Sequence, residues 1–284
     1  MVLYKDKMRY TVLIMGLACL MSSCTSIKLA IPDKFKEQAT VQHVKGARNN
    51  KMSFANFSTS KIKRGVHILS PVWSWEWDSR FLLENMVLNQ IGIQKNEPTT
   101  QEKTKFRYTL SDGRNKVQVY AHEKEIIKKT EYEVINRPSI LDGFEMLQGY
   151  NYIFSAIISA DTTQPNKTWQ LLMTNIYNRK AANDKNPFTF VKPDDDGLAT
   201  NGIDTIFIKP LSIKKTALSN GKTGQLPFKL LSGYELSTSD GVVAIVDLID
   251  RNIWFYNELG ATERLNISAI ATAIFARKVH DVKW

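Results

Sequence analysis

The ten residues Ile267–Ala276, near the end of the chain, are apolar at every position except Ser268 and Thr272. At 3.6 residues per turn, the apolar positions are distributed around the whole circumference of a helix. A helix that is apolar on all sides is either buried in a protein core or placed in a membrane. Ten residues fall well short of the ~20 that span a bilayer. The stretch therefore predicts a buried helix over about 262–277, with Thr262 as its N-cap.

Short segments with alternating apolar residues precede this helix and predict antiparallel strands. Turn residues separate them, most clearly Asp112-Gly113 and Ser239-Asp240-Gly241. We therefore predict an α+β fold that is predominantly antiparallel β, either a sheet or barrel-like, around the buried C-terminal helix. The clearest predicted strands are 106–110, 117–121, 151–160, 168–178, 228–237, 242–249 and 253–256.

The first twenty-four residues have the organisation of an export signal. Three basic residues precede an apolar stretch of eleven, Thr11–Met21, which suits the hydrophobic region of a signal peptide and is too short to span a bilayer. The segment Met21-Ser22-Ser23-Cys24 follows, and small residues directly before a cysteine resemble the lipobox of bacterial lipoproteins. Methionine at position 21 departs from the leucine that is usual there.

This resemblance covers residues 1–24 alone and implies where the protein resides. It implies cleavage before Cys24, acylation of that cysteine and attachment to a membrane of a Gram-negative style cell envelope. Thr25 occupies the position where an aspartate would favour the inner membrane, so we expect the outer membrane. The predicted division is a signal peptide at 1–23, a lipidated basic tether at 24–50 and a mainly-β globular domain at 51–284, with an alternative division near residue 148.

Basic residues are concentrated just after the predicted anchor. Residues 25–64 hold nine Lys and Arg against two acidic residues, in a chain whose net charge is +10. Such a segment is either a solvated linker or a contact with anionic headgroups. We expect no nucleic-acid partner, because aromatic residues that stack on bases are not interleaved with these charges. The candidate membrane-surface residues are Lys28, Lys34, Lys36, Lys45, Arg48 and Lys51.

Three tryptophans alternate with polar residues in Trp73-Ser74-Trp75-Glu76-Trp77. On a strand, this spacing places Trp73, Trp75 and Trp77 on one face. Such a stripe is either part of the core, the interpretation we favour, or a platform for sugar rings or lipid. A helix over 80–90 or two short strands are the alternatives for the segment that follows.

Several candidate sites fail on spacing. Both cysteines lie in the leader and the four histidines are scattered, so we expect no metal and no cysteine nucleophile. Counted from Asp194, the acidic run 194–196 lacks the ligands of a calcium loop, which predicts an exposed acidic turn. Asn220-Gly221-Lys222-Thr223 lacks the first glycine of a phosphate-binding loop. Asp247 is expected to be an outward-facing strand residue and Asp250 to belong to a turn, so we do not expect them to form a catalytic pair.

The layout of an antiparallel sheet that ends in a buried apolar helix resembles tubby-like and scramblase-like domains, although no motif specific to those families is present. That resemblance implies a barrel geometry and a lipid association, and it transfers no site residue. We expect a non-enzymatic binding, scaffold or assembly component of the envelope, without a cofactor, whose partner is an envelope protein or glycan. The alternatives are a hydrolase of envelope polysaccharide or peptidoglycan and a lipid-handling module.

Overall fold

The computed structural model describes residues 28–29, 31–47, 49–65, 83, 86, 100–133, 143–160, 168–185, 195–217 and 223–277. Some predicted features fall outside these ranges. They are Cys24 with its leader, Arg48, the Trp73, Trp75 and Trp77 stripe, and nearly all of the predicted helix at 80–90.

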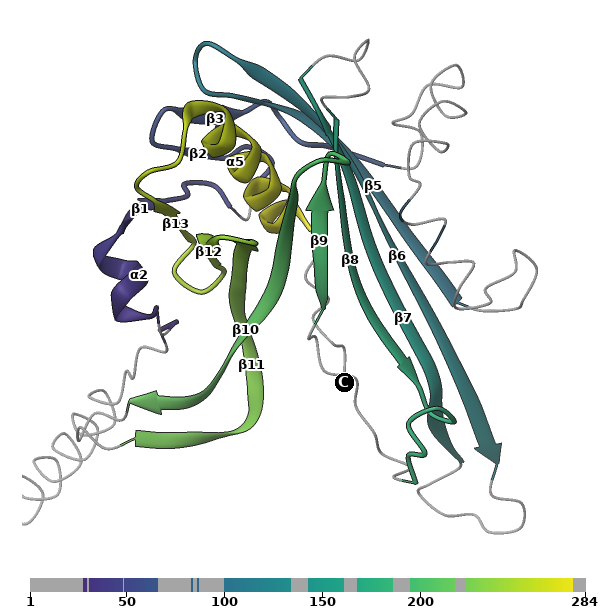
Figure 1. Cartoon of the computed structure of the whole chain (residues 1–284). Helices are drawn as coiled ribbons and strands as arrows, with labels where there is room; N and C mark the ends of the chain where they lie inside the picture. The colour runs from purple at the N-terminus through teal and green to yellow at the C-terminus, as the bar shows by residue number, and fades with distance from the viewer. Residues whose placement is uncertain are drawn as a thin grey trace, which may run out of the picture.

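The described residues are mostly β-strand, with one short helix before the sheet and one long helix at its end (Figure 1). The elements are α2 (Asp33–Glu37), β1 (Ala39–His43), β2 (Ser53–Phe54), β3 (Phe57–Thr59), β4 (Lys63–Arg64), β5 (Thr100–Ser111), β6 (Lys116–Glu133), β7 (Gly143–Ser159), β8 (Thr168–Asn178), β9 (Asp196–Thr200), β10 (Thr205–Ala217), β11 (Thr223–Thr238), β12 (Gly241–Asp247), β13 (Asn252–Tyr256) and α5 (Ala261–Ala276).

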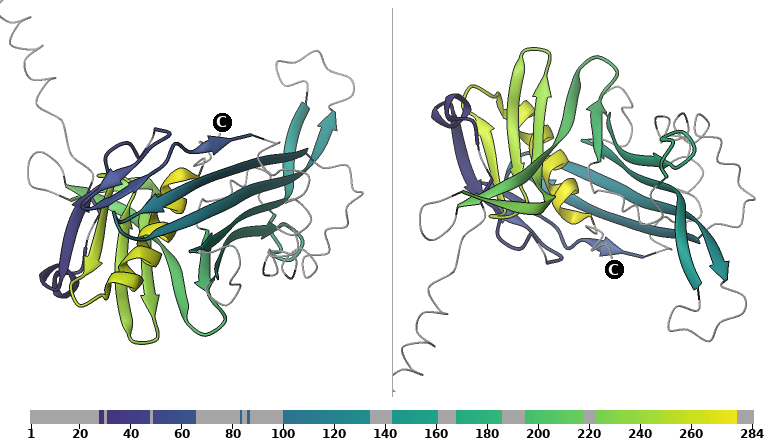
Figure 2. Two further views of the ribbon diagram at one scale, coloured as in Figure 1. Left: turned by 90° about the horizontal axis from the view of Figure 1, so that it is seen from above. Right: turned by 90° about the horizontal axis from the view of Figure 1, so that it is seen from below.

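All the strands belong to one antiparallel sheet in the order β1-β13-β12-β11-β10-β9-β8-β7-β6-β5-β3-β2, and β4 also pairs with β5. From β5 to β13, neighbours in the sheet are neighbours in the sequence, so this part is a meander. The sheet curls into a nearly closed barrel (Figure 2). Its two ends meet where Lys45, just beyond β1, pairs with Ser53 of β2 through N···O distances of 2.9 and 3.0 Å.

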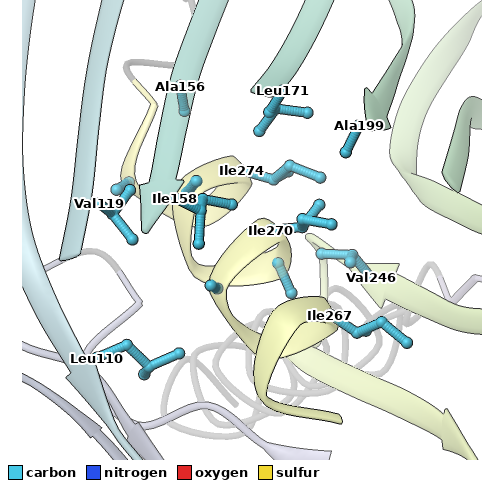
Figure 3. Packing of buried hydrophobic residues seen from close by; sticks show 14 of the residues in the cluster. Leu110, Val119, Ala156, Ile158, Leu171, Ala199, Val246, Ile267, Ile270 and Ile274 are labelled. Carbon is cyan, nitrogen blue, oxygen red and sulfur yellow. The ribbon is translucent and has the colours of Figure 1, made fainter. Parts of the chain in front are cut away.

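The long helix α5 lies inside this curled sheet and forms its core (Figures 1 and 2). Ile267, Ile270 and Ile274 are buried against strand residues such as Leu171 and Val246, which point at the helix (Figure 3). Since strands surround α5, an apolar side chain is favourable on every side of the helix. None of the helices in the described part of the chain is long and apolar enough to cross a membrane.

The predicted fold class is confirmed. The chain is α+β with a dominant antiparallel sheet, and the predicted helix at 262–277 is α5, which begins one residue earlier and ends one residue earlier. The predicted turn at Asp112-Gly113 is also present: Asp112 accepts hydrogen bonds from the backbone N–H groups of Arg114 and Asn115, and Gly113 has φ +94°. Positive φ is a conformation that glycine adopts without strain.

Several predicted boundaries differ from the structure. The predicted tether contains two folded elements, α2 and β1, so the sheet begins before residue 51. β7 runs through residue 148, the alternative domain boundary, with a bulge in its pairing with β6 at that position. β11 begins at Thr223 rather than Phe228 and so includes Pro227. Local composition obscures the start of β11, because glycine and proline are depleted in average strands but tolerated in strands that have an unpaired edge.

Candidate functional site

A cluster of charged and aromatic residues lies inside the barrel where α5 ends. We call it the Arg277 cluster, and it consists of Arg277, Asp195, Tyr234, Tyr152 and Glu123. Arg277 directly follows α5, and Asp195 directly precedes β9. The other three come from β11, β7 and β6, at positions that alternation points towards the interior. All five are buried, with 7% exposure for Arg277 and 4% for Asp195.

Three of these residues form a closed set of hydrogen bonds. The Arg277 guanidinium donates through Nη1 to Asp195 Oδ2, which makes a buried ion pair. The Tyr234 hydroxyl donates to Asp195 Oδ1 at 2.6 Å and accepts from Arg277 Nη2 at 2.6 Å. Charge-assisted hydrogen bonds of this kind are stronger than neutral ones. The set joins the end of α5 to β11 and to the start of β9.

Aromatic rings enclose the guanidinium. The Cζ atom of Arg277 lies 5.0 Å from the centroid of the Tyr234 ring and 5.5 Å from that of Phe154, within the range of cation–π attraction. Beside this set, the Tyr152 hydroxyl donates to Glu123 Oε2 at 3.4 Å. The Nε atom of Arg277 is buried without a hydrogen-bond partner among the described residues.

The surroundings fix the charge states in the cluster. Burial raises the pKa of Tyr234 and of Tyr152, so both phenols are neutral at physiological pH. Burial opposes the charge on Arg277, but the neighbouring Tyr234 and Asp195 raise its pKa well above the ordinary value. Arg277 therefore remains a cation that is held against the Asp195 carboxylate.

A second arginine contacts the same end of α5. Arg64 donates from Nη2 to the carbonyl oxygen of Ala276 at 2.7 Å, and its guanidinium lies 5.1 Å from the centroid of the Phe106 ring. Positive charge at a helix C-terminus is stabilising, because the last carbonyl groups carry partial negative charge. One turn earlier, the Tyr108 hydroxyl donates to Thr272 Oγ1 at 2.8 Å. The cluster and these contacts together fix the position of α5 along the barrel.

The Arg277 cluster has the chemistry of a structural contact that holds α5 in place. Its guanidinium, carboxylate and Tyr234 hydroxyl are engaged with one another, and burial keeps the phenols protonated. An arrangement of this type holds α5 in register with the strands and offers no activated nucleophile. Within the described ranges, no group of three or more His, Cys, Asp or Glu side chains is placed to hold a metal ion.

Two predictions about carboxylates are wrong. The acidic run 194–196 was expected to be an exposed turn. Asp194 lies outside the described residues and Asp196 is exposed, but Asp195 is buried, where Arg277 and Tyr234 pair with it. Asp247 was expected to point outward, but it is 3% exposed. Its Oδ1 accepts from the backbone N–H groups of Ile249 and Asp250 at 2.9 and 3.1 Å, which builds the predicted turn. Burial raises the pKa of Asp247.

The predicted surface residues are dispersed over the start of the sheet. Lys34 and Lys36 lie on α2, Lys45 follows β1, and Lys28 and Lys51 lie outside regular structure; all five are exposed. They are therefore free to meet a charged surface, but the structure does not bring them into one site. Nothing in the local sequence signals the Arg277 cluster, since its ion pair joins residues 82 positions apart.

The fold and the cluster define a class of protein, in which a nearly closed, barrel-like antiparallel sheet surrounds one apolar helix and a buried ion pair holds the C-terminus of that helix. Comparisons of the chain with protein-family models, with curated proteins and with solved structures give no match.

Proposed function

We propose that the protein is a lipid-anchored component of the cell envelope, attached through Cys24 to the outer membrane, which acts by binding rather than by catalysis. The observation that carries this proposal is the packing of α5 inside the barrel, where Ile267, Ile270 and Ile274 occupy the interior. The interior of small barrels is commonly the ligand site, and here a helix fills it. The outer surface and the strand ends remain for an envelope protein or glycan partner.

The buried charges support the same proposal. The Arg277–Asp195 pair lies where α5 meets β9 and β11, and its polar groups hold those elements together. A catalytic carboxylate instead needs access to substrate, whereas Asp195 is buried and engaged by Arg277 and Tyr234. An anchored scaffold requires a rigid body and an exposed surface, and a barrel with a helical core provides both.

Replacing Cys24 with alanine is expected to move the protein from the membrane fraction to the soluble fraction, because acyl chains contribute about 0.8 kcal/mol per buried methylene. The measurement is quantitative blotting of fractionated cells, together with incorporation of labelled fatty acid into the wild-type protein. Cys19→Ala is the matched control, since it changes the other cysteine and leaves position 24 intact. Labelled Cys24→Ala protein in the same membrane fraction would contradict the proposal.

Binding is tested on the wild-type protein extracted in mild detergent. We expect one envelope component to co-purify reproducibly with the protein in a fixed ratio. The same component should be captured by cross-linking before extraction. Turnover of purified peptidoglycan or envelope polysaccharide by the pure protein would instead favour the hydrolase, and stoichiometric lipid that remains after extraction would favour lipid handling.

A further inference from the structure

A two-stranded ribbon extends from the barrel, and we call it the arm. It consists of residues 209–217 of β10 and 223–232 of β11. β9 pairs with β10 only as far as Ile208, and β12 pairs with β11 only from Gly233 onward. Beyond these points, β10 and β11 pair with no other strand of the described part of the chain, and they pair with each other. Figure 1 shows the ribbon leaving the body of the barrel beyond α2.

The far end of the arm is turned sideways. In the β10–β11 register, Ile213 pairs with Leu230 but Lys215 pairs with Gln225, so one residue of β10 faces four residues of β11. Those four residues include Pro227, which has no N–H for the ladder. Such a bulge bends a ribbon, and Figure 1 shows the last part of the arm lying across the direction of the rest.

The charge of this part of the chain has one sign. Between Asp204 and Glu235 the sequence contains five lysines and no Asp, Glu or Arg. Four of them, Lys209, Lys214, Lys215 and Lys229, are positions of the two strands. The same strands carry Leu211, Leu226, Phe228 and Leu230, whereas Ile213 of β10 is buried. Basic and apolar residues together are typical of segments that bind the surface of an anionic bilayer.

The proposed anchor lies close to the base of the arm. A Cβ atom added at Gly233 would lie 3.2 Å from Leu29 Cδ2, so the segment that follows the leader contacts β11 at this point. Leu29 is five residues after Cys24. Five residues reach at most about 18 Å when fully extended. A bilayer that holds the acyl chains of Cys24 is therefore within about 18 Å of the base of the arm.

We propose that the arm is a second membrane contact, in which its lysines bind the phosphate headgroups of anionic phospholipids and orient the barrel on the bilayer. The placement of the arm beside the bilayer rests on the proposed acylation of Cys24. The positive charge of the arm does not depend on that acylation. An acyl chain alone leaves a protein free to rotate about its tether, and a second contact removes that freedom. The surface offered to partners is then the side of the barrel away from the arm.

The test uses the chain from residue 24 onward with Cys24→Ala, so that no acyl chain contributes. Vesicles of phosphatidylcholine with and without phosphatidylglycerol are sedimented with the protein at several salt concentrations. We expect binding to the anionic vesicles that falls as salt rises. In the double variant Lys214→Gln/Lys215→Gln, the coefficient for partition of the protein from water to anionic vesicles should fall by at least about tenfold, because each lysine near an anionic surface contributes about 1 kcal/mol.

The matched control is Arg114→Gln/Lys116→Gln, which removes two positive charges from exposed positions at the β5–β6 turn. This variant should bind as the parent does. Equal losses in both variants would reduce the effect to net charge and overturn the proposal. Equal binding to neutral and anionic vesicles would also overturn the proposal. Lysine also protects open strand edges from pairing with other chains. Self-association of the lysine variant without a change in vesicle binding would therefore assign the lysines to that role and overturn membrane contact.

A second measurement does not depend on the stability of a lysine variant. Because the chain from residue 24 with Cys24→Ala has no cysteine, Ala217→Cys provides one labelling site at the end of β10. A polarity-sensitive dye there should shift to shorter wavelength with anionic vesicles, and a dye at Arg114→Cys should not. Cross-linking of the dye site to a protein in cells, with no shift on vesicles, would assign the arm to a protein partner and overturn membrane contact. Failure of fatty-acid labelling at Cys24 would remove the proposed anchor and leave this result unchanged.

Discussion

Replacing Arg277 with methionine is expected to lower the free energy of unfolding by about 3–5 kcal/mol, the cost of leaving one partner of a buried ion pair uncompensated. The variant leaves the Asp195 carboxylate buried without its cation and removes the donor to the Tyr234 hydroxyl. Because a domain is commonly stable by only about 5–15 kcal/mol, the change should be evident in urea denaturation at pH 7.

The matched control is Arg114→Met, which makes the same replacement at an exposed turn and should change stability by less than about 0.5 kcal/mol. Combining Arg277→Met with Asp195→Asn removes both charges. The double variant should lose less stability than the sum of the two single losses, because the two residues are in direct contact. Additive losses would contradict the pairing of these two residues.

Replacing Ile270 with alanine is expected to destabilise the protein by about 2–5 kcal/mol, the range measured when a buried Ile loses its branched side chain and leaves a cavity. Ile270 is 0% exposed at the centre of α5, where strands surround the helix (Figure 3). Collapse of the cavity is limited, since the helix is enclosed by the curled sheet.

Ile203→Ala provides the control for this change, because Ile203 is 88% exposed and the chemical substitution is identical. We expect a change of less than about 0.5 kcal/mol there. Thermal unfolding followed by circular dichroism reports both variants. Similar midpoints for Ile270→Ala and Ile203→Ala would mean that α5 does not form the core.

The central helix could be predicted because its signal is local. Ten consecutive residues with two polar positions leave one interpretation once the length excludes a membrane span, and α5 lies where that argument places it. The turns at Asp112 and Gly241 could be predicted for the same reason, since turn chemistry depends on adjacent residues.

The Arg277 cluster could not be predicted, because its ion pair depends on which strands become neighbours. Asp195 lies in a run of three acidic residues that suggests an exposed turn, and only the curvature of the sheet brings it to Arg277. β1 was hidden in the same way, since its pairing partner β13 is more than two hundred residues away. The sequence of β1 does not show which distant strand it pairs with, although β13 itself could be predicted from its alternation.

Amide hydrogen exchange of the intact protein tests most directly the central claim that α5 is the enclosed core of the barrel. We expect the amides of Ile267–Ile274 to exchange as slowly as the most protected amides of β6 and β7, because α5 becomes accessible only when the barrel unfolds globally. Exchange of α5 through a local opening, while β6 and β7 remain protected, would contradict this claim.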